Sequence, residues 1–148
     1  MSLLQNEVIC ITGASRGVGE CLAHCLAENG AKKLILVAED EQGLKTASWA
    51  WTADKAKSAG AKDVETHICD LADAKAVQAL GDKLAGMGVT CLINNAGVFL
   101  GGEDDPLKAG QGAVAPEDVA EAVLLPFRCS ANCVPEEIVL KAAQPGNA

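Results

Sequence analysis

A glycine-rich stretch, TGASRGVG at residues 12–19, is the part of the sequence best suited to chemistry. It follows an apolar run and opens a segment with helical periodicity, so its backbone N–H groups lie at a helix N-terminus, where anions bind. Gly13 permits a tight turn, Gly17 lets the backbone approach a diphosphate, and Gly19 allows close packing of helix on strand. In this strand-to-helix context the stretch predicts a dinucleotide phosphate site; elsewhere it would indicate only a turn.

A second candidate residue is Glu39, which follows the next apolar run about twenty residues after the glycine stretch. An acid at this position bonds the ribose 2′-hydroxyl of NAD and repels the 2′-phosphate of NADP. The alternative is that Glu39 is only a solvated residue at the end of a strand. On its own, Glu39 favours NAD slightly.

These residues need a sheet to bring them together, and four short runs predict one. Three runs, residues 8–12, 33–38 and 91–96, are continuously apolar, as in parallel strands buried on both faces. The fourth, residues 64–69, alternates apolar Val64 and Ile68 with polar side chains, as expected near a sheet edge. With right-handed crossovers, the economical strand order is 3-2-1-4. The predicted fold class is α/β, a Rossmann-like doubly wound parallel sheet.

Three helices are predicted between these strands, because apolar residues recur there at helical spacing. Their ends are marked by Asn29–Gly30, Gly60 and Gly86, which suit the end of a helix. The apolar stripes are Val18, Cys21, Leu22, Cys25 and Leu26 in the first, Leu44, Ala47 and Trp51 in the second, and Ala76, Leu80 and Leu84 in the third.

The pattern changes after Gly97, where residues 101–112 are polar, glycine-rich and without period, as in a loop. Pro116 then opens a short helix that Pro126 ends, and residues 136–142 predict a last strand. The inward residues of that helix are Val119, Val123 and Leu124. We expect one truncated domain over residues 1–148, with a cofactor-binding half at 1–100, a junction loop at 101–113 and a C-terminal helix and strand at 114–148.

These motifs together resemble the short-chain dehydrogenase/reductases. That family has a TGxxxGxG motif, an Asp and an apolar residue after the third strand, and an NNAG motif after the fourth. The sequence matches them with residues 12–19, with Asp70–Leu71 and with residues 94–97, in the same order. Its tail is similar too, since APEDVAEAV resembles the family's last large helix and NCVPEEIVLKAAQP its closing strand. The resemblance covers nearly the whole chain.

The resemblance implies an oxidoreductase that transfers hydride to a carbonyl or from an alcohol, with NAD or NADP as cofactor. It implies that Asp70–Leu71 contact the adenine end and that residues 95–97 line the ribose and support the sheet. Arg16 stands where members that prefer NADP often carry a basic residue, which opposes the tendency of Glu39. The expected cofactor-binding residues are Gly13, Ser15, Arg16, Gly17, Val18, Gly19, Glu39, Asp70, Leu71, Asn95, Ala96 and Gly97.

The middle of the family pattern has no counterpart in this sequence. In the family, the segment between the NNAG strand and the last helix carries a structural Asn, a catalytic Ser and Tyr-x-x-x-Lys. This chain contains no tyrosine, and residues 101–112 contain no serine. A positioned acid is typically worth ~10²–10⁴ in the rate of such a reaction, and His24 and His67 fall in segments unsuited to that role.

We therefore expect no catalytic residue and a catalytically impaired member of the family. Two alternatives stay open. One is a non-catalytic module that binds a dinucleotide or pairs with a partner chain, and the other is a splice or gene-model product. A transcript that spans the junction near Gly110 would count against the last.

The overall composition limits the partners and the location of the protein. The net charge of −8 is spread along the chain without a basic stripe, so no nucleic-acid partner is expected. No apolar run approaches the roughly 20 residues of a membrane span, and no leader pattern opens the sequence, which favours a cytoplasmic protein without a membrane partner.

Seven cysteines, several inside apolar runs, favour reduced thiols that serve as small apolar side chains. Cys21 and Cys25, and again Cys129 and Cys133, have the i,i+4 spacing that would suit a four-thiolate metal site. The first pair belongs to an apolar stripe and the second flanks a proline-bounded loop, so no metal site is expected.

The missing segment also predicts an exposed sheet edge. Residues 91–96 have the composition of a strand covered on both sides, yet a usual neighbour is absent. Such an edge leaves backbone groups unpaired beside an apolar surface. We expect either that residues 136–142 pair with it or that the chain associates with itself or with a partner there.

Overall fold

The structure is a computed structural model that describes residues 2–39, 42, 63–97 and 114–142. In chain order its main elements are β1 (Val8–Thr12), α1 (Gly17–Glu28), β2 (Lys33–Ala38), β3 (Asp63–Ile68), α4 (Ala74–Ala85), β4 (Cys91–Ile93) and α5 (Pro116–Arg128). The predicted second helix, with Leu44, Ala47 and Trp51, and the predicted junction loop lie outside the described residues.

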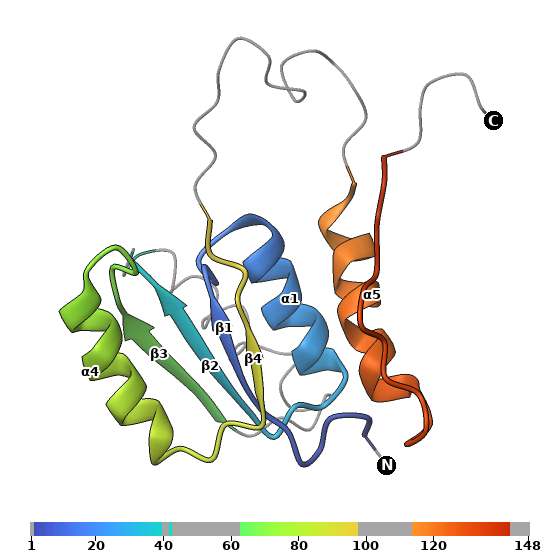
Figure 1. Ribbon diagram of the computed structural model, residues 1–148, viewed down its shortest axis with the longest axis horizontal. Helices are drawn as coiled ribbons and strands as arrows, with labels where there is room; N and C mark the ends of the chain where they lie inside the picture. Colours follow the sequence, from blue (N-terminus) through green and yellow to red (C-terminus); the bar gives the residue numbers. More distant parts are fainter. Residues whose placement is uncertain (1, 40–41, 43–62, 98–113, 143–148) are drawn as a thin grey trace, which may run out of the picture.

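The four strands form one parallel sheet in the order β3-β2-β1-β4 (Figure 1). β1 pairs with β2 on one side and with β4 on the other. β2 pairs with β3 along its length, from Lys33 opposite Asp63 to Ala38 opposite Ile68. The predicted α/β fold class and the order 3-2-1-4 are confirmed, and the carboxyl ends of all four strands meet at one edge of the sheet.

Alternate side chains of the central strands supply two apolar layers, one on each face of the sheet. On one face, Ile9 and Ile11 pack with residues of α1 and α5. On the other, Val8 and Cys10 pack with Leu80 of α4. β1 and β2 are thus buried on both sides, as predicted. The same prediction for β4 is wrong, since none of its residues is fully buried and Leu92 is 55% exposed.

The helix α1 follows the predicted stripe and the predicted end. Leu22 and Leu26 are buried, while Val18, Cys21 and Cys25 are partly buried against the same layer. The side chain of Asn29 donates a hydrogen bond of 2.8 Å to the carbonyl of Cys25, and Gly30 adopts a φ of 80° that favours glycine. α4 likewise matches its prediction, with Gly86 as its C-cap residue.

The helix α5 begins at Pro116, as predicted, but it continues through Pro126 to Arg128. The predicted end at Pro126 is therefore wrong. Proline lacks an N–H but its φ suits a helix, so the chain loses one hydrogen bond without having to turn. The next turn is still closed, because the backbone N–H of Cys129 donates to the carbonyl of Leu125 at 3.1 Å.

The inward side of α5 contacts α1 through Ala120 and Leu124, which are buried. Val123 packs against the same layer, as predicted. Val119 instead lines a shallow groove between α5, Cys91 and the residues that follow the helix.

The predicted strand at residues 136–142 is not formed. The backbone there has no regular structure, and Ile138, Val139 and Leu140 are exposed. This segment lies along α5, where Pro135 and residues 136–138 line the groove (Figure 1). A strand needs a ladder partner, and α5 presents only side chains, because its backbone groups are used within the helix.

Two strands differ from their predictions, β4 in its bounds and β3 in which residues are exposed. β4 stops at Ile93 instead of residue 96. β3 holds the predicted edge position, but its inward residue is Val64 alone, since Ile68 is 57% exposed. The polar residues of β3 are held instead by an ion-pair network that joins β2 to β3.

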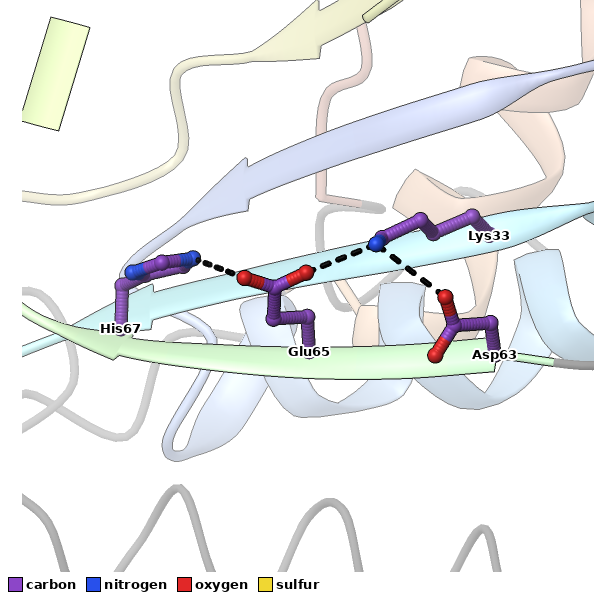
Figure 2. A network of polar contacts seen from close by, with 4 residues as sticks. All are labelled: Lys33, Asp63, Glu65 and His67. Carbon is purple, nitrogen blue, oxygen red and sulfur yellow. Dashed lines mark hydrogen bonds and ion pairs between the residues drawn. The ribbon is translucent and has the colours of Figure 1, made fainter. Parts of the chain in front are cut away.

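Figure 2 shows this network, in which the ammonium group of Lys33 bridges two carboxylates. Lys33 Nζ lies 3.1 Å from Asp63 Oδ2 and 2.7 Å from Glu65 Oε2. Glu65 Oε1 lies 3.0 Å from Nε2 of His67. The hydrogen bond from Lys33 lowers the pKa of Glu65. The edge that β3 presents is therefore strongly charged, and such edges resist pairing with another chain.

Candidate cofactor-binding site

A cavity of about 580 Å³ lies where the four strands end. Its lining comes from the turn after β1 and from the residues that follow β2, β3 and β4. Ligands of open α/β sheets bind outside this edge, on either side of the point where the strand order reverses. The predicted site residues that line it are Gly13, Ser15, Arg16, Val18, Glu39, Asp70, Leu71, Asn95, Ala96 and Gly97.

The glycine loop owes its shape to two residues with left-handed backbone angles. Gly13 has a φ of 65° and Gly17 a φ of 59°, values that are costly for residues with a side chain. The N–H of Ala14 donates to the carbonyl of Val37 at 3.1 Å, which anchors the loop to the end of β2. The loop thus turns within a few residues from β1 into α1.

The N-terminus of α1 faces this cavity and carries no side-chain cap. Its N-cap residue, Arg16, has extended backbone angles, and the side chain of Arg16 accepts no hydrogen bond from the first turn. In α4, by contrast, Oδ1 of Asp73 accepts from the N–H groups of Lys75 and Ala76 at 2.8 and 3.4 Å. Free N–H groups at the positive end of a helix suit an anionic ligand.

Gly19 brings α1 unusually close to the loop that precedes it. A Cβ at Gly19 would overlap the carbonyl oxygen of Gly13 and lie 2.6 Å from Nδ2 of Asn95. A Cβ at Gly13 would lie 2.7 Å from Cα of Ala96. Neither position has space for a side chain, so the glycines at 13 and 19 are required for packing as well as for the turn.

Asn95 and Thr12 join the end of β1 to the residues after β4. The Asn95 side-chain amide donates to the carbonyls of Thr12 and Gly13, both at 3.1 Å. In return, the hydroxyl of Thr12 accepts from the backbone N–H groups of Asn95 and Ala96, both at 3.1 Å. These bonds replace the sheet ladder, which explains why β4 ends at Ile93.

On the opposite side of the cavity, Asp70 is fixed by a short turn. Its Oδ1 accepts a hydrogen bond of 2.8 Å from the N–H of Ala72. Leu71 is 43% exposed and supplies an apolar wall next to this carboxylate. Both residues lie where the resemblance expects the adenine end of a cofactor, although their role in binding stays a prediction.

Arg16 and Glu39 both lie on the cavity lining and both are exposed. One carries a positive charge at the start of α1, and the other a negative charge after β2. The structure therefore places at the same site the two residues for which opposite cofactor preferences were predicted.

A family model described as short chain dehydrogenase matches residues 7–134, which is most of the chain. The chain belongs to the short-chain dehydrogenase family. Galactitol 2-dehydrogenase from Agrobacterium fabrum is 38% identical over 96 residues, which are 65% of this chain and 34% of the relative. The human protein Short-chain dehydrogenase/reductase 3 is 34% identical over 119 residues, 73% of this chain and 36% of the relative. The chain thus spans little more than a third of these curated relatives.

Solved structures show the same relation. A metagenomic short-chain oxidoreductase in complex with NADP is 35% identical and has a TM-score of 0.54 over 66% of this chain and 42% of the other. The actinorhodin polyketide ketoreductase with NADPH is 30% identical, with a TM-score of 0.53 over 65% of this chain and 35% of the other. This chain therefore matches less than half of each of these two structures.

Two predicted site residues, Gly17 and Gly19, are absent from the cavity lining. They act through backbone shape and helix packing. Four further lining residues were missed by sequence reasoning: Val37, Ala38, Cys69 and Ala72. The hydrogen bonds by which Thr12 joins β1 to the residues after β4 were also missed, although Thr12 is the first residue of the family's glycine motif. Position at the end of a strand is the signal that would have found them.

No histidine of this chain lies on the cavity lining. His67 is held by Glu65 on β3, and His24 lies on α1 with Nε2 4.0 Å from Glu20. Cys69 does line the cavity, but burial, and then the charges of nearby aspartates, raise the pKa of its thiol.

Other features of the described residues concern metals and membranes. No group of three or more His, Cys, Asp or Glu side chains is arranged there to hold a metal ion. Each helix in this part of the chain is too short or too polar to cross a lipid bilayer.

The close approach at Gly19 yields a prediction with a matched control. Gly19→Ala should lower the free energy of unfolding by about 1–3 kcal/mol, because the new methyl group overlaps the Gly13 carbonyl. Gly81→Ala, within α4 and with open space around it, should raise that free energy by roughly 0.5–1 kcal/mol. Urea denaturation of both variants measures the two changes. Changes of the same sign would contradict the packing role of Gly19.

Proposed function

We propose that this chain binds a nicotinamide dinucleotide at the carboxyl edge of its sheet and does not by itself turn over a carbonyl substrate. The observation that carries the first part is the uncapped N-terminus of α1 beside the cavity. A diphosphate would accept hydrogen bonds from N–H groups that α4, capped by Asp73, does not offer.

The rest of the lining is consistent with the two ends of such a ligand. Asp70 and Leu71 offer a carboxylate and an apolar wall at one side, while the backbone at Asn95–Gly97 offers polar groups at the other. The cavity volume falls in the range of roughly 300–1,000 Å³ that is usual for ligand sites. NADP and NADPH are the ligands in two structures of related proteins.

The charges on the lining determine which dinucleotide is preferred. Arg16 would pair with a 2′-phosphate, whereas Glu39 would repel that phosphate and bond a free 2′-hydroxyl. The sequence favoured NAD slightly, through Glu39. The NADP(H) complexes of related proteins support the opposite assignment, so we propose that both dinucleotides bind and that the balance of these two residues sets their ratio.

Cofactor binding can be tested by fluorescence titration of the purified chain with NADH and NADPH. Arg16→Ala should weaken NADPH by roughly 10- to 100-fold, the value of a charge-assisted hydrogen bond, and leave NADH nearly unchanged. Glu39→Gln should do the reverse, with weaker NADH and stronger NADPH binding. Lys83→Ala, an exposed cation in the last turn of α4, is the control and should change neither. If neither nucleotide saturates below millimolar concentration, the binding site is wrong.

The second part of the proposal concerns proton transfer. When bound, the cofactor supplies a hydride, and the alkoxide that develops on the substrate must receive a proton from a positioned acid. The chain has no tyrosine, so the Tyr-x-x-x-Lys pair of complete relatives cannot form. The nearest alternative on the lining, Cys69, has a raised pKa and is almost fully buried, which leaves it poorly placed to meet a substrate.

Loss of that acid should lower turnover by ~10²–10⁴ relative to an intact family member. Loss of the walls that orient the substrate should add a further cost in proximity. The measurement is nicotinamide absorbance with a panel of ketones, aldehydes and hydroxy acids, beside an intact relative and at saturating cofactor. Turnover within about tenfold of the relative would contradict this part of the proposal, even if the binding titration succeeds.

A second candidate function, a module that pairs with another copy of the chain, is favoured by the edge at β4. Leu92 is 55% exposed, and β4 contains only apolar or thiol side chains. Within the described residues, no strand pairs with its outer side. The opposite edge, β3, carries the charges shown in Figure 2, so association through β4 is the more favourable of the two.

Pairing through β4 predicts a concentration-dependent dimer in sedimentation velocity. Leu92→Lys should shift the chain toward monomer, because the charge would lie in the paired edge. Ile68→Lys, an equally exposed apolar residue on β3, should leave the dimer in place. A monomer whose β4 amide protons exchange freely with solvent would contradict the pairing function and leave cofactor binding unaffected.

A further inference from the structure

Two cysteines lie close together where the chain leaves α5. Cys129 is the C-cap residue of the helix, and its side chain is half-buried. The chain then turns, with the N–H of Cys133 donating to the carbonyl of Ser130 at 2.9 Å. Cys133, at the end of this turn, is exposed. Both thiols are free.

The two thiols interact with each other and differ in exposure. A side-chain hydrogen bond between Cys129 and Cys133 is the main cause that raises the pKa of Cys129. Cys133 is exposed and Cys129 is half-buried, so the Cys133 sulfur is the one that a small disulfide can reach first.

We propose that Cys129 and Cys133 are a redox-active thiol pair that closes to an intrachain disulfide by exchange with a low-molecular-weight disulfide. The Cys133 thiolate attacks one sulfur of the small disulfide, forms a mixed disulfide and releases the first small thiolate. Cys129 then loses its proton, and its thiolate attacks the Cys133 sulfur and displaces the second. The pair loses two electrons, and the reagent becomes two thiols that carry the two protons.

The other pair with the same spacing shows why the turn is needed. Cys21 and Cys25 lie within the regular helix α1 and pack partly against the core. Asn29 donates to the sulfur of Cys25 at 3.8 Å, and burial is the main cause that raises the pKa of both thiols. A helix fixes the direction of its side chains, whereas a disulfide needs a specific dihedral angle and a short separation of the Cβ atoms. Cys129 and Cys133 lie outside regular structure and can adjust.

The position of the pair gives its oxidation a structural consequence. The turn that the disulfide would close lies directly before Pro135, from which the chain runs back along α5 and lines the groove there. Closing the ring would hold the chain at the point where it leaves the helix. This site lies on the α5 side of the fold and shares no residue with the cavity at the strand ends.

A single digest tests the proposal on the full chain. The protein is incubated with oxidised glutathione, its remaining thiols are alkylated, and it is cleaved by trypsin. Cleavage after Arg128 and Lys141 gives peptide 129–141 with Cys129 and Cys133, and cleavage after Arg16 and Lys32 gives peptide 17–32 with the α1 pair. Mass spectrometry reads both pairs in one sample.

The expected result is that peptide 129–141 loses both alkylation sites together, with no glutathione attached, while peptide 17–32 stays alkylated. Cys129→Ser should instead trap glutathione on Cys133, and Cys133→Ser should react much more slowly. A wild-type peptide that keeps both alkylated thiols, or that carries glutathione without ring closure, would overturn the proposal. So would equal oxidation of the α1 pair, because the turn would then confer no selectivity.

Discussion

The hydrogen bonds between Thr12 and the residues after β4 are the constraint on which the site depends. The hydroxyl of Thr12 is buried and accepts from two backbone N–H groups, and the Asn95 amide donates to two carbonyls of the turn. Each such bond contributes about 1 kcal/mol net to the stability of the fold. Their more important effect is on the shape of the site. They fix the first turn of the glycine loop against the end of β4. Gly19, which has no Cβ, then allows α1 to pack closely against that turn.

The groups proposed to bind the cofactor and the groups that carry catalysis in complete relatives come from different segments of the sequence. Every group proposed to hold the dinucleotide comes from the first 97 residues, at the carboxyl ends of four strands. The proton donor of complete relatives comes from a segment that this chain lacks. The first 97 residues can therefore keep the geometry of the proposed binding site. None of the hydrogen bonds that hold the glycine loop requires the missing catalytic segment.

The sequence was sufficient to predict the sheet order and the glycine loop, because strand periodicity, crossover handedness and the need for glycine are local or general constraints. Prediction from the sequence failed where contacts with distant parts of the chain determine the local structure. Pro126 suits either the end or the last turn of a helix, and residues 136–142 form a strand only beside a free ladder. Ile68 was expected inside, but it is 57% exposed although Val64, on the same side of β3, packs against the core. In the site, Cys69 and Thr12 were missed since their roles arise from burial and from backbone partners.

The packing of α5 on α1 joins residues that are about a hundred positions apart. The entropy lost when such a loop closes grows only with the logarithm of its length, by about 0.6 kcal/mol for each doubling. A shorter connection between β4 and α5 therefore changes the cost of bringing these helices together very little. Contacts of this range do slow folding, because they form only after the intervening chain is ordered. Deletion between β4 and α5 thus leaves the α1–α5 contact nearly as favourable and makes it quicker to reach.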